Sequence, residues 1–436
     1  MPNAIATLAL AAWPLVTLAL FMRLRIDLAI IWSLMLGYLF LPETPAMLID
    51  PPLMPELNKQ TIPALAVFLC VLMRHGLSAP ILPQTALPRA FILVFLFSPL
   101  LTALTNDETI SYGVVELPGH DLKSSVGMIV TQFLMVLPFL LARQFMASAE
   151  SLRSLVKAIV AGALVYSVLM LIEVRFSPQL NVWIYGYFQH DFSQTIRFGG
   201  WRPTVFLIHG LWVAFFVMSA TLCAWALWKT DPAPGNRPWL LVAVYLTAIL
   251  ILAKSLGAIL YALAGLPILL LLRRETVLRL SLAVALLASA YPLIKAADTG
   301  VEDRLVGAFA AYVPERAESL AFRFSNETEL MVRANEKPLF GWGGYARNHF
   351  HDPFTGRLLT VTDGRWIILI GTYGWVGYIA EFGLLLSPLL LIWRAHRTAG
   401  ADDQAPLSPL VPVLCLLLAI NLVDLLPNAT LTPLTW

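Results

Sequence analysis

Charged residues are scarce in this chain. Asp, Glu, Lys and Arg make up 13% of its 436 residues, whereas a typical soluble domain has about 25%. Hydrophobic residues make up 58%, and several apolar runs have about 17 residues or more, enough to cross a hydrocarbon core. Because backbone groups inside lipid must find partners within their own segment, these runs should be helices. The composition excludes a soluble globular protein and predicts an all-α polytopic membrane protein.

Three further features are missing. The three cysteines, Cys70, Cys223 and Cys415, lie in apolar runs without metal-site spacing, so we interpret them as small buried hydrophobic residues. No basic segment precedes the first apolar run, which favours a retained helix over a cleaved signal peptide. No internal repeat indicates the matched halves of a transporter. These absences disfavour a cysteine-based metal centre and a repeat-based transporter.

The apolar segments predict about 12 transmembrane helices. Basic residues are concentrated in every second short connection, for example Arg23 and Arg25 in the first. By the positive-inside rule these connections face the cytoplasm. Residues 173–203, 253–256 and 295–365 then share the outer face, together with both termini. The predicted helices are 4–22, 28–41, 61–73, 90–105, 125–141, 155–172, 204–228, 238–253, 256–272, 277–294, 366–392 and 407–426.

These segments divide the chain into three parts. Residues 1–294 form a membrane domain with an outer loop at 173–203. Residues 295–365 form a long outer loop, in which apolar and charged residues follow spacings typical of short amphipathic helices on or over the bilayer. Residues 366–436 form the C-terminal transmembrane helices. We expect the long loop to carry active-site residues.

Arginine is concentrated in the outer segments, although the positive-inside rule predicts few basic residues there. RFGGWRP places Arg197 and Arg202 just before an apolar run, and AKSLGA places Lys254 between two helices with almost no loop. No carboxylate is adjacent to these three residues, and guanidinium groups match phosphate oxygens bidentately. They therefore predict a site for a phosphate or diphosphate group. Arginines of the long loop, such as Arg323 and Arg347, either assist there or pair with nearby glutamates or lipid head groups.

The stretch GWGGYARNHFHD adds titratable side chains to the long loop. Pro338 and the glycines that follow it predict a turn after a helix-like segment at 318–337. His349, His351 and Asp352 then project into the outer space. HxHD alone is a weak metal signal, so no metal is predicted. An imidazole titrates near neutrality, so either histidine is a candidate general base, while solvated loop histidines are the simpler alternative.

Four segments carry a family resemblance: RFSNETELMVRANEKPLFGWGGYA, WIILIGTYGWVGYIAEFGLL, AKSLGAILYALAGLPILLLL and RFGGWRP. The first is similar to a helix of the family that begins with an arginine and ends in a P-x-x-G-x-G turn. The second is similar to the last long span of the family, which contains G-x-x-G. The third is similar to a basic-Ser-x-Gly turn, with Lys254–Ser255 where Ser–Arg is usual. The fourth is similar to an arginine before the central span. Over residues 197–390 the chain thus resembles the O-antigen polymerase and ligase superfamily, the Wzy- and WaaL-like membrane glycosyltransferases.

The resemblance implies a GT-C-like fold in the bacterial cytoplasmic (inner) membrane, with the active site facing the periplasm. It implies transfer of a sugar chain from undecaprenyl diphosphate, with inversion at the anomeric carbon and no metal or cofactor. Arg197 or Arg202 would hold the donor diphosphate, and Lys254 would replace the second phosphate-binding arginine, with help from Arg323 or Arg347. The lipid-linked glycan and membrane lipids are the expected partners. A chain-length regulator is a further candidate, and no nucleic acid is expected.

One position departs from the family pattern. Members carry His-Asn just before the last long span, where this chain has Thr362-Asp363-Gly364. Either Asp363 takes the role of the base, or His349 or His351 reaches in from the preceding loop. Because the usual histidine is displaced, we favour an exopolysaccharide or O-antigen polymerase, which extends one lipid-linked glycan on another. A ligase, which moves the glycan to lipid A-core or another acceptor, is the alternative.

Two other classes of protein stay open. A flippase or transporter for lipid-linked sugars predicts charged residues that line a central path. Its candidates are Glu173, Glu381 and Asp424. A non-enzymatic subunit of a polysaccharide export complex predicts an outer loop that only docks a partner. Dependence of activity on Arg202 or Lys254 would argue against the subunit.

Overall fold

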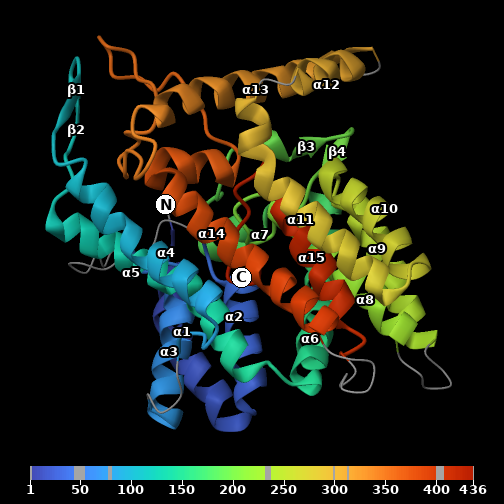
Figure 1. The fold of residues 1–436 in the computed structure, drawn as a ribbon. Coiled ribbons are helices and arrows are strands. Elements are labelled where there is room, and N and C mark those ends of the chain that lie inside the picture. Colours follow the sequence, from blue (N-terminus) through green and yellow to red (C-terminus); the bar gives the residue numbers. More distant parts are fainter. Residues whose placement is uncertain are drawn as a thin grey trace.

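The structure, a computed structural model, is mostly helical (Figure 1). It describes residues 2–43, 55–76, 81–230, 237–297, 300–311, 314–398 and 407–435. The helices are α1 (Ala4–Arg23), α2 (Ile26–Phe40), α3 (Thr61–His75), α4 (Ala86–Leu104), α5 (Leu122–Phe145), α6 (Ala149–Phe176), α7 (Leu180–Tyr185), α8 (Gly210–Thr230), α9 (Arg237–Leu252), α10 (Leu256–Leu271), α11 (Arg274–Ala296), α12 (Val301–Ala310), α13 (Pro314–Asn335), α14 (Arg365–Thr398) and α15 (Val411–Asp424), with a 3-10 turn η1 (Phe192–Thr195). The strands form two hairpins, β1 (Ile110–Tyr112) with β2 (Val115–Leu117) and β3 (Ile196–Arg197) with β4 (Gly200–Trp201).

Seven helices in the described part of the chain are long and apolar enough to cross a membrane. They are α1, α4, α5, α6, α8, α11 and α14, and five shorter apolar helices, α2, α3, α9, α10 and α15, accompany them. Each predicted apolar segment coincides with one of these helices, so the prediction of a helical membrane protein is confirmed. The shorter helices rise only about 21–24 Å at about 1.5 Å per residue. The count of about 12 spans therefore stays a prediction.

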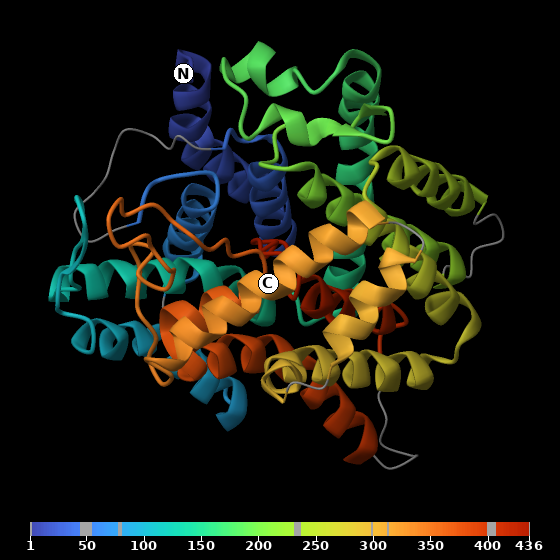
Figure 2. The ribbon, with the colours of Figure 1, turned by 90° about the horizontal axis from the view of Figure 1, so that it is seen from above.

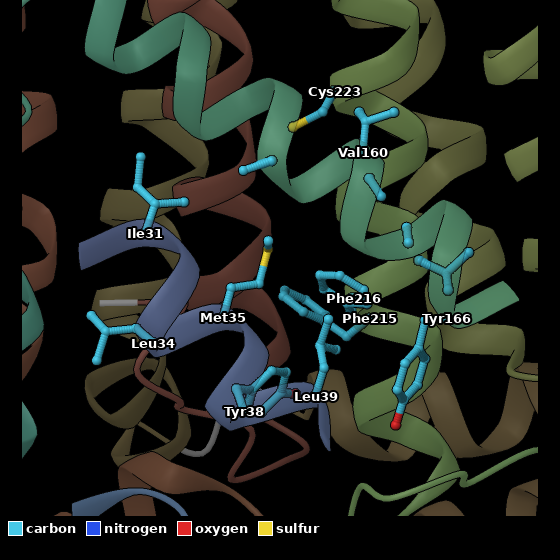
Figure 3. Packing of buried hydrophobic residues seen from close by; sticks show 14 of the residues in the cluster. Ile31, Leu34, Met35, Tyr38, Leu39, Val160, Tyr166, Phe215, Phe216 and Cys223 are labelled. Atoms are coloured by element: carbon cyan, nitrogen blue, oxygen red, sulfur yellow. The ribbon is translucent and has the colours of Figure 1, made fainter. Parts of the chain in front are cut away.

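The bundle packs around α8. Of the seven long helices, α8 has the most buried apolar window, with 78% of it covered by other parts of the chain. Phe216 and Cys223 of α8 point toward α2 and α6 in Figure 3. The ring of Phe216 meets the edge of Tyr166, with 6.3 Å between centroids, and lies 6.5 Å from the ring of Tyr38. All three cysteines of the chain are buried and unbridged, as predicted.

Contacts between connections sort the helix ends into two groups. Arg25, between α1 and α2, pairs with Glu150 at the start of α6. At the other end, the backbone N–H of Asn3 donates to the Tyr185 carbonyl over 2.9 Å. The long segment 295–365 covers this second end, which we call the α13 end (Figure 1). The chain after α15 first meets the α13 end, where the Pro427 carbonyl accepts from Arg323. Which end faces the cytoplasm stays a prediction.

The long segment lies across the α13 end as two helices. α12 and α13 run roughly crosswise to the bundle (Figures 1 and 2), which confirms the predicted amphipathic helices. Lys295, near the end of α11, anchors them, since its Nζ donates to the Glu302 carboxylate over 2.7 Å. The β1–β2 hairpin, which the sequence does not predict, projects from the same end. Its strands have three residues each, too few for a visible alternation, and it turns at Gly113 with φ of 57°.

The predicted span 204–228 begins six residues too early. α8 starts at Gly210, and residues before it form a turn. The buried carboxylate of Glu173 accepts the backbone N–H groups of Thr204 over 2.8 Å and Val205 over 2.7 Å. Val205 also has a φ of 51°. A buried carboxylate therefore holds this apolar stretch out of the helix and fixes the entry to α8.

The predicted span 366–392 is not one straight helix. Gly374 has φ of 67° and ψ of −171°, which breaks α14 into two helical parts. Arg365 consequently lies beside Glu381, with 2.6 Å between its Nη2 and a carboxylate oxygen. A straight helix would separate these residues by about 24 Å. The long membrane-spanning part of α14 thus follows Gly374, and residues 365–373 form a short helix that turns back on it.

Candidate functional site

Basic residues gather where the β3–β4 hairpin meets the turn between α9 and α10. Lys254 occupies that turn with φ of 51°, and its Nζ donates to the Arg197 carbonyl oxygen over 3.3 Å. Gly200, opposite Arg197 in the hairpin, permits this approach, because a Cβ there would lie 2.2 Å from the Lys254 Nζ. The fold thus brings the predicted residues Arg197 and Lys254 together from distant parts of the sequence.

Arg202 joins this group from the end of the hairpin. It is buried, with 4% of its surface exposed. Its side chain lies across Gly210, the first residue of α8, where a Cβ would come within 2.6 Å of the guanidinium Nε. Its backbone N–H donates to the Thr195 carbonyl over 2.7 Å. Arg202 therefore supplies a positive charge that is fixed in position at the start of α8.

Two histidines that the sequence analysis did not select belong to the same group. The exposed ring of His190 lies 5.2 Å from the ring of His209. Burial, followed by the positive charge of Arg202 and then the neighbouring His190 and Arg197, lowers the pKa of His209 to about 3. The signal that could have found both histidines is their position, since they flank RFGGWRP closely in the sequence. We call Arg197, Arg202, Lys254, His190 and His209 the cationic cluster.

Hydrogen bonds assign the proton on His209. Its Nδ1 accepts the backbone N–H of Leu211 over 3.1 Å, so the neutral ring carries its proton on Nε2. That Nε2–H faces the Gln194 Oε1 at 3.1 Å. Both ring nitrogens are therefore engaged, and His209 orients its neighbours instead of accepting a proton. His190 is the histidine of the cationic cluster whose ring is open to solvent.

His349 has the geometry of a general base. Its Nδ1 lies 3.1 Å from the Thr360 carbonyl oxygen. A carbonyl can only accept, so Nδ1 carries the proton and Nε2 keeps a lone pair. Burial lowers the pKa of His349 below its usual value, which keeps the ring neutral at pH 7. A neutral imidazole with one nitrogen held by a carbonyl and the other unprotonated is the arrangement that proton abstraction requires.

His351 packs the loop against the β1–β2 hairpin. It is buried, and its ring stacks on Tyr112 with 4.7 Å between centroids and 18° between planes. Its Nδ1 lies 3.2 Å from the His349 carbonyl oxygen. Burial lowers the pKa of His351 as well. The stacking and the burial favour a structural role for His351 over the predicted role as base.

Arg347 is completely buried and fastens the same hairpin. Its Nη1 donates to the carbonyl oxygens of Glu108 over 2.7 Å and Pro118 over 2.9 Å. Its Nη2 donates to the Glu108 carboxylate over 3.0 Å. The guanidinium thus ties the chain entering the hairpin to the chain leaving it. The geometry favours this structural role over the predicted diphosphate contact.

Arg323 and Asp363 pair with each other. The distance from the Arg323 Nε to the Asp363 carboxylate is 3.3 Å, and both side chains are a little more than a third exposed. The Arg323 Nη1 also donates to the Pro427 carbonyl over 3.4 Å. A predicted diphosphate ligand and a predicted base therefore have each other as partners. We call Arg323, Arg347, His349, His351 and Asp363 the loop cluster.

The glycine motifs of the family resemblance pack against each other. The backbone N–H of Trp342 donates to the Gly371 carbonyl over 2.8 Å, and that of Trp375 to the Pro338 carbonyl over 2.8 Å. A Cβ on Gly374 would lie 2.2 Å from a carbonyl oxygen in the turn after α13. The P-x-x-G-x-G turn therefore sits in the break of α14. This contact sets the position of the loop that carries His349.

The two clusters both lie at the α13 end. Figures 1 and 2 show the β3–β4 hairpin and the β1–β2 hairpin on different sides of α13. The structure thus brings together Arg197, Arg202 and Lys254, and separately the predicted residues of the long loop.

Comparisons with known proteins add no family. No family model matches the chain, and no curated protein matches it either. Within the described ranges, no group of three or more His, Cys, Asp or Glu side chains is placed to hold a metal ion. The argument for a function therefore rests on the geometry of the two clusters and on the residues that carry the family resemblance.

Proposed function

We propose that the chain is a glycan polymerase of the bacterial cytoplasmic membrane that acts at the periplasmic face. It transfers a sugar chain from undecaprenyl diphosphate to a hydroxyl of another lipid-linked glycan, in exopolysaccharide or O-antigen biosynthesis. The reaction inverts the anomeric carbon and uses no metal. A GT-C-like fold with about 12 spans is part of the same proposal. The assembly of the cationic cluster at one end of an apolar helix bundle is the observation that carries it.

The cationic cluster suits a departing diphosphate. As the bond from the anomeric carbon to the diphosphate oxygen breaks, its electron pair goes to the diphosphate, which gains negative charge. The guanidinium group of Arg197 can face two phosphate oxygens, the Lys254 ammonium adds a point charge, and the buried Arg202 adds a fixed positive charge behind them. Because the fold already holds these groups in place, they require little reorganisation at the moment of reaction. One such donor contributes about 100- to 1,000-fold in rate.

The attacking hydroxyl has to lose a proton as it bonds to the anomeric carbon. Among the three predicted bases, His349 has a neutral ring with an unprotonated Nε2. His351 is stacked and buried, and Asp363 is paired with Arg323. We therefore assign His349 as the base, a role that contributes about 100- to 10,000-fold in rate. Binding of an acceptor has to bring its hydroxyl within reach of both clusters.

The three charged candidates for a transport path have structural partners. Glu173 accepts backbone N–H groups of Thr204 and Val205. Glu381 pairs with Arg365. The Asp424 carboxylate accepts from nearby side chains of the segment that follows α15. These contacts favour an enzyme over a flippase.

The test uses purified full-length protein in nanodiscs with an undecaprenyl diphosphate-linked oligosaccharide and no other acceptor. A ladder of longer glycans on a gel is the readout. We expect a ladder from the wild type and its loss in Arg197→Ala and Lys254→Gln. Arg175→Ala is the matched control, because Arg175 is an exposed arginine at the α13 end of α6, outside the cationic cluster.

The acceptor distinguishes the alternatives. Product that forms only after addition of lipid A-core would make the protein a ligase with the same donor site. Absence of product with every acceptor, together with movement of the lipid-linked sugar across the bilayer, would overturn the enzyme proposal in favour of a flippase. Equal loss of the ladder in Arg175→Ala would remove the cationic cluster as the donor site.

A further inference from the structure

A large cavity lies inside the helix bundle, away from both clusters. It has a volume of about 690 Å³, within the range of about 300–1,000 Å³ that small-molecule sites occupy. Side chains of α2, α5, α6, α8, α14 and α15 line it, together with residues 83–88 and 430–435. Figure 3 shows part of its wall, with Met35, Tyr38 and Phe216. The cavity reaches the surface at the end opposite α13, where the lining residues Thr85 and Ala147 are exposed.

The lining indicates what can fill this space. Most of it is hydrocarbon from Leu, Ile, Phe, Met and Pro side chains. Water in a buried site needs two to four polar partners, and most of this wall offers none. An empty cavity would leave its wall without packing partners on one side. A hydrocarbon chain satisfies such a wall, and the surrounding membrane is a source of one.

Asn421 is one of the few polar side chains in this apolar wall. It lines the cavity and is 2% exposed, and neither its Oδ1 nor its Nδ2 has a hydrogen-bond partner among the described residues. A buried amide without partners is unfavourable unless a ligand supplies them. Thr432 and Thr435, from the segment that follows α15, also line the cavity. The occupant therefore carries a group that both donates and accepts hydrogen bonds at this end.

Charge limits the occupant further. Arg143 is the one charged residue that lines the cavity in the described part of the chain. Its Nη2 donates to the Ile81 carbonyl oxygen over 2.9 Å, near the opposite end of the cavity from Asn421. No cation lies beside Asn421 in the lining to hold a phosphate or carboxylate. The polar group of the occupant is therefore uncharged, unlike the head of a phospholipid or of the proposed donor.

We infer that this cavity binds one molecule of an uncharged hydroxyl-bearing lipid of the monoacylglycerol type. Its hydroxyl and ester groups face Asn421, and its hydrocarbon chain fills the space toward Arg143. Hydroxyl groups donate to the Asn421 Oδ1, and ester or hydroxyl oxygens accept from the Nδ2. The site is separate from the cationic cluster, so it stands whether or not the protein is a glycan polymerase.

The test uses the full chain in nanodiscs with a monoacylglycerol that carries a diazirine in its acyl chain. After irradiation, peptide mass spectrometry locates the label. We expect about one label per protein, on peptides of α5 and α15 that line the cavity. Asn421→Leu, which keeps the shape and removes the hydrogen bonds, should weaken binding about tenfold. Leu417→Trp, which fills the cavity, should abolish labelling there.

Two controls keep the test specific. Leu287→Trp makes the same replacement on an exposed face of α11 that does not line the cavity, and should not change the label. A fatty acid with the same diazirine chain tests the charge, and should label the cavity at least tenfold less at equal concentration. Equal labelling of wild type and Leu417→Trp, equal labelling by the fatty acid, or label spread only over exposed helix faces would overturn the inference.

Discussion

The cationic cluster and the loop cluster each contain two arginines and two histidines, and they differ in what surrounds the charges. In the loop cluster Arg323 pairs with Asp363 and Arg347 with Glu108. In the cationic cluster no ion pair between described residues involves Arg197 or Lys254, and the Lys254 ammonium meets a backbone carbonyl instead. The loop cluster uses its charges to hold the fold. In the cationic cluster, Arg197 and Lys254 keep their charges available for an anion.

The histidines of the two clusters differ in the same way. His209 lies near arginine charges, which add to burial in lowering its pKa to about 3, and both its ring nitrogens are engaged. His349 is oriented by the Thr360 carbonyl and keeps an unprotonated Nε2. We thus propose that binding of a diphosphate and abstraction of a proton take place on different sides of α13. The following changes test this division.

The largest effect is expected from the double variant Arg197→Ala/Lys254→Gln. Removing two groups that face the leaving diphosphate should lower the turnover rate about 1,000-fold or more. The melting temperature should change little, because Arg197→Ala keeps the backbone carbonyl of the contact with Lys254 and a glutamine amide can still donate to it. Initial rates in nanodiscs and a thermal melt measure the two quantities.

The matched control for this double variant is Arg175→Ala/Arg357→Ala. It removes the same number of positive charges from exposed positions outside both clusters. If both double variants lose activity equally, the effect is one of overall surface charge, and the contrast between the clusters fails.

The next effect concerns His349. His349→Ala should lower kcat/KM about 100-fold through loss of the base. In the wild type, burial lowers the pKa of His349, so the base stays unprotonated below its ordinary value of about 6.5. The acid limb of the kcat/KM profile should therefore lie below about pH 6.5 and should disappear in His349→Ala. A limb above that pH, or one that the variant keeps, would assign the base elsewhere.

The same lowered pKa values have a consequence for stability. The unfolded chain binds a proton at each of His209 and His349 near pH 6.5, and the folded protein does not. Stability should thus fall as the pH drops through about 6.5. His209→Gln should reduce this dependence, as a melting curve at several pH values would show.

A smaller effect is expected from Arg347→Met. The change leaves the carbonyl oxygens of Glu108 and Pro118 without their donor. We expect a loss of about 2 kcal/mol in the stability of the β1–β2 hairpin, seen as faster amide hydrogen exchange at residues 108–118. Arg357→Met, at an exposed position, should change it by less than about 0.5 kcal/mol. Weaker donor binding without faster exchange would return Arg347 to the diphosphate site.

Much of the fold follows from local sequence properties. Long apolar runs require helices in lipid, so the helices appear close to their predicted positions. The positive-inside rule also predicts, from charge alone, which connections face the cytoplasm. The break in α14 at Gly374 could not be predicted in this way. A glycine within an apolar run shows where a helix can break, but whether it does depends on what packs against it. The segment that packs against Gly374, the P-x-x-G-x-G turn, comes from a distant part of the chain.

The candidate site also has a part that local sequence predicts and a part that depends on distant residues. Arg197 and Lys254 could be selected because no carboxylate is adjacent to them in sequence, and the structure places them together. His190 and His209 were missed although both flank RFGGWRP, because the electrostatic contact of His209 with Arg202 and Arg197 forms only in the folded chain. The role of Arg347 depends on Glu108, a partner more than 200 residues away. Spacing within a loop cannot show which arginine has such a distant partner.

The smallest effect is expected at the Arg323–Asp363 pair. Both side chains are more than a third exposed, and such pairs contribute about 1 kcal/mol or less. Asp363→Asn should therefore lower the free energy of unfolding by less than about 1 kcal/mol. If Asp363 only pairs with Arg323, turnover should fall by about threefold or less, and Arg323→Gln should change it no further in the double variant. A fall of about 100-fold in Asp363→Asn alone would make this carboxylate the base, and the loop cluster would then hold the fold and carry out proton transfer through one ion pair.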